Sequence, residues 1–213
     1  MIAALEISDR VPRQTEHPVD SAAPSTVTAD SAPDLLHQTL EASVQDRQLA
    51  TPHGQPVRRL THGVVIRRLV THTDERGSLT ELFDPRWGEH PGPLVFAYTF
   101  TVRPNVVKGW SLHRAHEDRY AMLQGDLALV LFDPRSDSPT YGETCRVVLS
   151  EHDRCLVNVP ANVWHADHNI GARDVVVVNF PTEPYNHASP DRWRLPIDTP
   201  LIPYQFPPGT QGG

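Results

Sequence analysis

Short apolar segments separated by turn residues recur along the chain after Val57. Six of them are rich in Val, Leu and Phe, which suit a pleated, half-buried surface, and they span residues 64–70, 94–102, 126–133, 145–149, 155–160 and 174–180. Gly, Pro and Asp stand between them, and no intervening stretch has the 3.6-residue period of an amphipathic helix. Because parallel sheets need crossover connections that are usually helical, this pattern argues against an α/β fold and predicts an all-β sandwich or barrel.

Residues 1–56 have a different composition. They are poor in large apolar residues and contain six prolines, so they cannot bury enough surface to offset the entropy lost on ordering. We expect an N-terminal arm that is disordered or forms one short helix. That helix is predicted by Leu36, Leu40 and Val44, which recur every four residues, with Asp34 as its N-cap.

The remaining residues, 57–213, are expected to form one barrel domain, with the proline-rich residues 194–208 covering it. A formal net charge of −7 argues against a nucleic-acid binder, since phosphate contacts require a basic surface. No window approaches the roughly 20 apolar residues of a membrane helix, and the first ten residues lack the basic start of a secretory signal. Cys145 and Cys155 have neither a C-x-x-C spacing nor a disulfide-rich context. We therefore predict a cytoplasmic protein with free thiols and no membrane or nucleic-acid partner.

Two histidine-containing motifs stand far apart in the chain. In the first, His113 lies five residues before Asp118, and Gly125 follows. The second, P-x-N-x-x-H-x-x-x-N, spans residues 160–169 and contains His165. The pair resembles the two signatures of the cupin superfamily, whose fold is a double-stranded β-helix (a jelly-roll barrel) with both motifs facing one cavity. The resemblance implies that His113 and His165 meet at one site.

Four motifs in order resemble a narrower family, the dTDP-4-dehydrorhamnose 3,5-epimerases. They are DERGSLTELF (74–83), LH (112–113), DPRSDSPTYG (133–142) and P-x-x-x-x-H (160–165). The resemblance covers about residues 64–206. It implies an isomerase that acts on a nucleotide sugar or another small carbonyl compound, without a cofactor, in carbohydrate biosynthesis or secondary metabolism. It also implies a homodimer, because relatives pair through their barrels, often with strand exchange.

The resemblance assigns roles where residues match. His113 corresponds to the catalytic base, and Asp198 is the best match for the carboxylate that orients it. Arg76 corresponds to an arginine that binds the nucleotide, and Glu81 to a residue that contacts the base or sugar. His165 is expected to line the pocket.

Two departures from the family pattern concern the acid and the phosphate contacts. The family's acid is a tyrosine that aligns near Asn179, and an amide cannot donate a proton as a phenol does. Its role would pass to Tyr98, Tyr120 or Tyr185. Lys108 stands in for an arginine and keeps the charge without the bidentate geometry. The predicted substrate-binding residues are Arg76, Glu81, Tyr98, Lys108, Arg119, Tyr120, His165, Asn179 and Tyr185.

A histidine of near-neutral pKa can remove a proton alpha to a carbonyl, which favours metal-free chemistry at His113. One alternative is a divalent metal ion held by His113, Asp118 and His165 in a lyase, cyclase or dioxygenase. Ser111, where most metal-binding cupins have their first histidine, weakens that ligand set. The other alternative is a non-catalytic sugar- or ligand-binding barrel, which Asn179 suggests because the acid is lost.

Overall fold

The computed structural model describes residues 34–46, 48–54, 57, 59–88 and 92–213, in two compact units, Met1–Leu49 and Ala50–Gly213. In the first unit, α1 (Leu35–Glu41) is the predicted helix, and the Asp34 side chain accepts a hydrogen bond from the Leu36 N–H at 3.1 Å as its N-cap. All residues of α1 are exposed. The arm predicted before residue 34 lies outside the described residues. Nowhere in the described ranges is a helix long and apolar enough to cross a bilayer.

The second unit is built from short strands. They are β1 (Val65–Arg68), β2 (Thr71–Asp74), β3 (Gly77–Thr80), β4 (Tyr98–Val102), β5 (Val106–Leu112), β6 (Asp118–Gln124), β7 (Asp126–Phe132), β8 (Thr144–Ser150), β9 (Cys155–Val159), β10 (Trp164–Asn169), β11 (Val175–Asn179), β12 (Trp193–Arg194) and β13 (Gln211–Gly212). Each of the six predicted apolar segments overlaps one of them: β1, β4, β7, β8, β9 or β11. The all-β prediction is confirmed.

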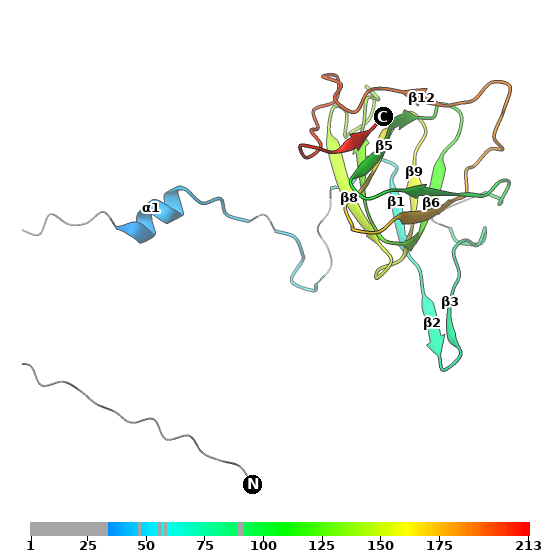
Figure 1. Ribbon diagram of the computed structural model, residues 1–213, viewed down its shortest axis with the longest axis horizontal. Helices are drawn as coiled ribbons and strands as arrows, with labels where there is room; N and C mark the ends of the chain where they lie inside the picture. Colours follow the sequence, from blue (N-terminus) through cyan, green and yellow to red (C-terminus); the bar gives the residue numbers. More distant parts are fainter. Residues whose placement is uncertain (1–33, 47, 55–56, 58, 89–91) are drawn as a thin grey trace, which may run out of the picture. The chain divides into compact units, whose positions relative to one another are not determined.

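Two sheets form the walls of a barrel (Figure 1). One has the strand order β1-β9-β6-β11-β4, and the other has the order β12-β5-β10-β7-β8, with β13 added parallel to β5. All other pairings are antiparallel. Because β5 and β10 lie in one sheet and β6 in the other, the two histidine motifs contribute to facing walls. This is the arrangement expected for a jelly roll.

The main core fills the space between the sheets. It contains alternate residues of β7, Leu127, Leu129 and Leu131, packed against Val157 of β9 and Val177 of β11, all fully buried. Alternation is expected where every second side chain of a strand points inward. The other face of the β5-β10-β7 sheet is covered by the chain after β12.

That covering segment was predicted from its prolines. Ile202, Tyr204 and Phe206 pack on the fully buried Trp110 of β5, whose ring lies 6.2 Å from that of Tyr204 and 5.7 Å from that of Phe206. Next to Trp110, Gly109 allows β5 to approach β10 closely, since a Cβ there would lie 2.7 Å from the Ala166 Cα. The close approach brings the end of β5 beside His165 on β10.

The β2–β3 hairpin projects from the barrel (Figure 1). All of its strand residues except Thr80 are exposed. The hairpin carries Arg76 at its turn, and Glu81 follows β3.

Candidate active site

A cavity opens between the two sheets, where β5 ends and β6 begins. Its walls come from β4, β5, β6, β10 and the segment after β11. The expected meeting of the two histidine motifs is confirmed, because the ring centroids of His113 and His165 are 5.3 Å apart in this cavity. The predicted residues that line it are Tyr98, Lys108, His113, Tyr120, His165 and Tyr185.

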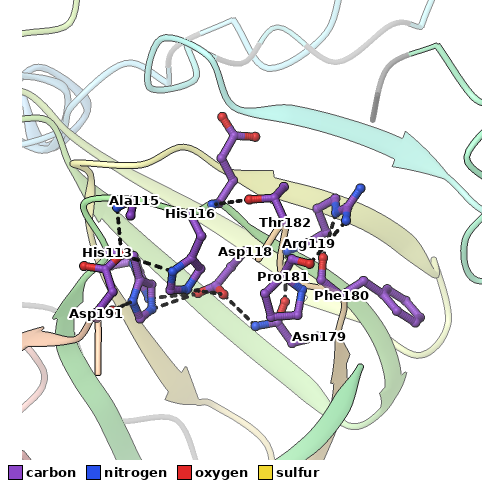
Figure 2. Close-up of polar contacts among 12 residues, drawn as sticks. His113, Ala115, His116, Asp118, Arg119, Asn179, Phe180, Pro181, Thr182 and Asp191 are labelled. Carbon is purple, nitrogen blue, oxygen red and sulfur yellow. Dashed lines mark hydrogen bonds and ion pairs between the residues drawn. The ribbon is translucent and has the colours of Figure 1, made fainter. Parts of the chain in front are cut away.

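Asp118, the first residue of β6, lies at the centre of the site (Figure 2). Its Oδ2 is 3.2 Å from His113 Nε2 and 3.5 Å from His165 Nε2, and these three residues are called the His–Asp cluster below. Oδ2 also accepts a hydrogen bond from the Tyr120 hydroxyl at 3.2 Å, and Oδ1 accepts one from Asn179 Nδ2 at 2.6 Å. Asp118 is only 1% exposed.

Burial of Asp118 opposes ionisation of its carboxyl, but the hydrogen bond and charge of His113, with His165 and Asn179, outweigh burial and lower its pKa. The carboxylate is therefore ionised at neutral pH. A buried negative charge next to two imidazoles favours the protonated form of either ring.

His113 is held from two sides. Its Nδ1 lies at hydrogen-bond distance from the main-chain oxygen of Asp191, and its Nε2 faces Asp118. A carbonyl oxygen can only accept, so Nδ1 carries the hydrogen, and Nε2 is the nitrogen that gains or loses a proton. Burial lowers the pKa of His113, but the hydrogen bond and charge of Asp118 outweigh it, and the pKa is raised overall. His113 is thus a stronger base than a free imidazole.

The carboxylate of Asp191 organises the loop after β5. It accepts hydrogen bonds from the main-chain N–H groups of Arg114 and Ala115 and lies 3.1 Å from His116 Nδ1 (Figure 2). The His116 ring lies 4.1 Å from the His113 ring, between centroids. Burial and the neighbouring His113 lower the pKa of His116.

Asp198 does not contact His113, and the predicted pairing is wrong. Leu195 exchanges main-chain hydrogen bonds with Trp110 on the outer face of β5, so the chain has left the cavity before residue 198. Asp198 is exposed and lines a separate hollow with Ile202 and Tyr204. The acidic residue from the C-terminal segment that meets His113 is Asp191.

His165 lies on β10 opposite Ser111 of β5 and is 2% exposed. Burial lowers its pKa to about 4, with the nearby Asp118 only partly offsetting the effect. His165 is therefore neutral at physiological pH, whereas its neighbour His113 has the higher proton affinity.

A tyrosine hydroxyl lies beside the position where the family pattern expects one. Asn179 of β11 is the cross-strand partner of Tyr98 on β4, and its Nδ2 donates to the Tyr98 hydroxyl at 2.9 Å as well as to Asp118. Burial and the Asp118 charge raise the pKa of Tyr98 to about 12. Its hydroxyl thus keeps its proton and lies one strand away from the expected position.

Four predicted substrate-binding residues are not part of the cavity lining: Asn179, which is fully buried and donates to Tyr98 and Asp118, and Arg119, Arg76 and Glu81. Arg119 is 1% exposed, donates to the main-chain oxygens of Phe180 at 2.6 Å and Pro93 at 3.2 Å, and stacks on the Phe83 ring. It points away from the cavity because its neighbour Asp118 points into it, as successive strand residues must.

Arg76 lies on the β2–β3 hairpin, where it pairs with Asp74 at 2.6 Å. Glu81 is exposed just after β3. Within one chain, neither residue belongs to the cavity lining.

Asp167 and Asp191 were missed by the sequence reasoning. For Asp167 a signal existed, since it stands two residues after His165 on a strand and so shares its face. Asp191 lies in a loop, and no periodicity could have placed it. Glu183 and Arg192 of the same loop also line the cavity.

Two groups of side chains have the donor atoms for a cation. His113, Asp118 and His165 offer atoms within 4.8 Å of one another, as do His113, His116 and Asp191. In the first group, Asp118 Oδ2 lies 3.2 Å from His113 Nε2 and 3.5 Å from His165 Nε2, and it also accepts a hydrogen bond from Tyr120. Three protein ligands around an open position are typical of a catalytic metal centre. The described donors can form a hydrogen-bonded cluster or serve such a centre.

Known proteins with similar sequences point to the same kind of site. The family model for dTDP-4-dehydrorhamnose 3,5-epimerase matches residues 60–195. A probable low-salt glycan biosynthesis epimerase of Haloferax volcanii is 33% identical over 138 residues, which are 64% of this chain and 88% of that protein. A spore coat polysaccharide biosynthesis protein of Bacillus subtilis is 31% identical over 146 residues, 68% of this chain and 95% of that protein.

Among solved structures, a dTDP sugar isomerase from Desulfovibrio desulfuricans has 25% identity and a TM-score of 0.63, covering 68% of this chain and 91% of that one. The similarity thus extends over the barrel and both histidine motifs. The chain belongs to the dTDP-4-dehydrorhamnose 3,5-epimerase family.

Proposed function

We propose that this enzyme epimerises a nucleotide-linked keto sugar at a carbon next to the keto group, with His113 as the base. The observation that carries the proposal is the His113 ring in the cavity, whose Nδ1 is tied to a main-chain carbonyl while Nε2 faces the buried, ionised carboxylate of Asp118. Membership of a sugar epimerase family and two relatives named for glycan or polysaccharide biosynthesis support it.

In the proposed first step, neutral His113 takes the proton from the alpha carbon through Nε2. The electrons of the broken C–H bond move into the enolate, and its negative charge develops on the keto oxygen. Asp118, 3.2 Å from Nε2, stabilises the imidazolium that forms. A positioned base of this kind contributes about 10²–10⁴-fold to the rate. The step needs no metal ion.

In the second step, the alpha carbon receives a proton on its opposite face. We assign this proton to Tyr98, because its hydroxyl lies in the cavity and is held by Asn179 at the position next to that of the family tyrosine. Tyr120 is less suitable, since its hydroxyl already donates to Asp118. Transfer from Tyr98 gives the inverted sugar and a phenolate. The phenolate regains a proton from solvent, and the His113 imidazolium releases one to solvent.

We also propose that the protein is a homodimer in which the β2–β3 hairpin of one protomer reaches its partner. The exposed hairpin and the exposed apolar side chains of Leu79, Leu94 and Val95 provide surface for such pairing. Strand exchange would let Arg76 and Glu81 serve the partner's cavity.

If the protein is a homodimer, light scattering should give twice the 23.8 kDa chain mass. An inactive Arg76→Ala protein mixed with inactive His113→Ala should regain part of the activity, whereas a monomer would regain none.

The main test follows the alpha hydrogens of the substrate. A dTDP-linked 4-keto-6-deoxyhexose incubated in D₂O should gain deuterium next to the keto group and change configuration, both visible by NMR. His113→Ala should abolish both changes, and His152→Ala, at an exposed site outside the cavity, should leave both intact.

Other results would favour the alternatives. Unchanged exchange in His113→Ala would refute the mechanism. Stoichiometric bound metal in protein purified without a histidine tag would favour a metal-dependent cupin. Tight binding without turnover would favour a non-catalytic barrel.

A further inference from the structure

Asp167 has no role in the steps above, yet it occupies a central place in the cavity. It lies on β10, lines the cavity and is 5% exposed. Its Oδ1 is buried and has no hydrogen-bond partner among the described residues. Buried polar atoms nearly always have a partner, and leaving one without costs about 1–3 kcal/mol. Because Asp167 lines the cavity, the missing partner of its carboxyl group can come from a bound ligand.

The surroundings favour the neutral form of this carboxyl. Burial, followed by the negative charge of Asp118, raises the pKa of Asp167 to about 8. The titratable or charged groups whose fields reach it are Lys108, His113, Asp118, Arg192, Tyr98 and Tyr120. The cations among them only partly counteract burial. Asp167 therefore carries a proton at neutral pH, and a protonated carboxyl is a hydrogen-bond donor.

Two other polar groups in the same walls are engaged with each other, since Tyr120 donates to Asp118, which also accepts from Asn179. The Lys108 ammonium lies 5.6 Å from the centroid of the Phe100 ring. The reaction proposed above creates a negative oxygen that no group assigned so far contacts. A donor placed where charge develops is often the largest contribution to catalysis.

We propose that the protonated carboxyl of Asp167 donates a hydrogen bond to the keto oxygen of the substrate and stabilises the enolate that forms when His113 removes the alpha proton. Asp167 keeps its proton throughout, so no bond of its side chain is made or broken. A neutral carboxylic acid in an apolar site is known to act in this way in ketosteroid isomerase. The inference rests on the proposed epimerase function and adds a catalytic residue to it.

The test compares Asp167→Ala and Asp167→Asn with the wild type. Loss of the donor in Asp167→Ala should lower kcat by about 10²–10³-fold, and the amide of Asp167→Asn should restore part of it. Deuterium exchange and inversion should fall in parallel, because the enolate precedes both. The alkaline limb of the pH–rate profile should vanish in Asp167→Asn, since an amide does not titrate. Asp137→Asn, an exposed substitution outside the cavity, is the matched control and should behave as wild type.

The outcomes separate this inference from the function on which it depends. If the wild type neither exchanges nor inverts any nucleotide-linked keto sugar, the epimerase proposal fails. If the wild type is active and Asp167→Ala matches it, or if the alkaline limb persists in Asp167→Asn, the role of Asp167 is refuted and the epimerase proposal stands. Loss of inversion with full exchange in Asp167→Asn would also refute it, since that pattern belongs to a proton donor to carbon. Circular dichroism spectra that match the wild type would show that both variants are folded.

Discussion

Replacement of Asp118 by asparagine removes the negative charge from the centre of the His–Asp cluster with little change in shape. The amide can still accept from Asn179, but it cannot offer a carboxylate oxygen to His113 Nε2 at 3.2 Å. At that separation, and with an effective dielectric constant of 20, the attraction between imidazolium and carboxylate is about 5 kcal/mol. Burial of both groups offsets part of it. The imidazolium formed in the first step therefore loses a large part of its stabilisation, and we expect kcat to fall roughly 10²–10⁴-fold.

The pH dependence of this variant has a definite sign. Asp118 raises the pKa of His113, so in the wild type the base becomes protonated, and activity falls, as pH drops through a value above 6.5. Without the carboxylate the pKa of His113 falls, and the acidic limb of kcat/KM moves to lower pH although the maximum rate is reduced. Rates of alpha-proton exchange between pH 5 and 9, followed by NMR, measure both effects. An acidic limb that stays in place in Asp118→Asn would show that His113 and Asp118 are not coupled as the structure indicates.

Three further predictions concern other residues. Asp198→Asn should leave kcat and the acidic limb of the pH profile unchanged, because Asp198 lies in a separate hollow; a shift of that limb would restore the predicted pairing with His113. Tyr98→Phe should retain alpha-proton exchange while inversion, measured by NMR, falls at least tenfold; equal loss of both would reject Tyr98 as the acid. The pKa of the Asp167 carboxyl rises from 3.8 in the unfolded chain to about 8 in the folded one. The carboxyl therefore destabilises the folded state increasingly as pH rises between these two values, by roughly 4 kcal/mol at pH 7. Asp167→Asn should therefore unfold at a higher temperature than wild type, with a difference that grows from pH 5 to pH 8 in calorimetry; a constant difference would contradict the burial of a neutral acid.

Local patterns in the sequence were sufficient to predict six of the strands, and the motif pair predicted the meeting of two histidines. The apolar segments around Leu129 and Val177 form core strands, because short apolar runs bounded by turn residues favour a buried strand whatever the neighbouring side chains are. His113 and His165 meet because the motif pair specifies a barrel, and a barrel of this kind directs both motifs inward. These conclusions depend on chain periodicity and on one resemblance.

Contacts made by irregular segments were beyond the reach of the sequence. Asp191 and Asp198 stand close together in irregular parts of the chain, and only the path of the chain decides which of them meets His113. Arg119 was assigned to the substrate from alignment alone, although strand alternation already directs it away from Asp118. Strand alternation could have placed Asp167 on the same face as His165. Its role could not be inferred from the sequence, because that role depends on the carboxyl oxygen having no partner in the folded protein.

The hold on His113 through a peptide carbonyl has an evolutionary consequence. The atom that contacts Nδ1 is a main-chain oxygen, which every residue has, while the Asp191 carboxylate fixes the loop through Arg114 and Ala115. The neighbouring side chains of Glu183, Tyr185 and Arg192, which line the same cavity, can then be exchanged without loosening the imidazole. Substitutions in this loop can therefore change which sugar is bound while the His113 ring keeps its position.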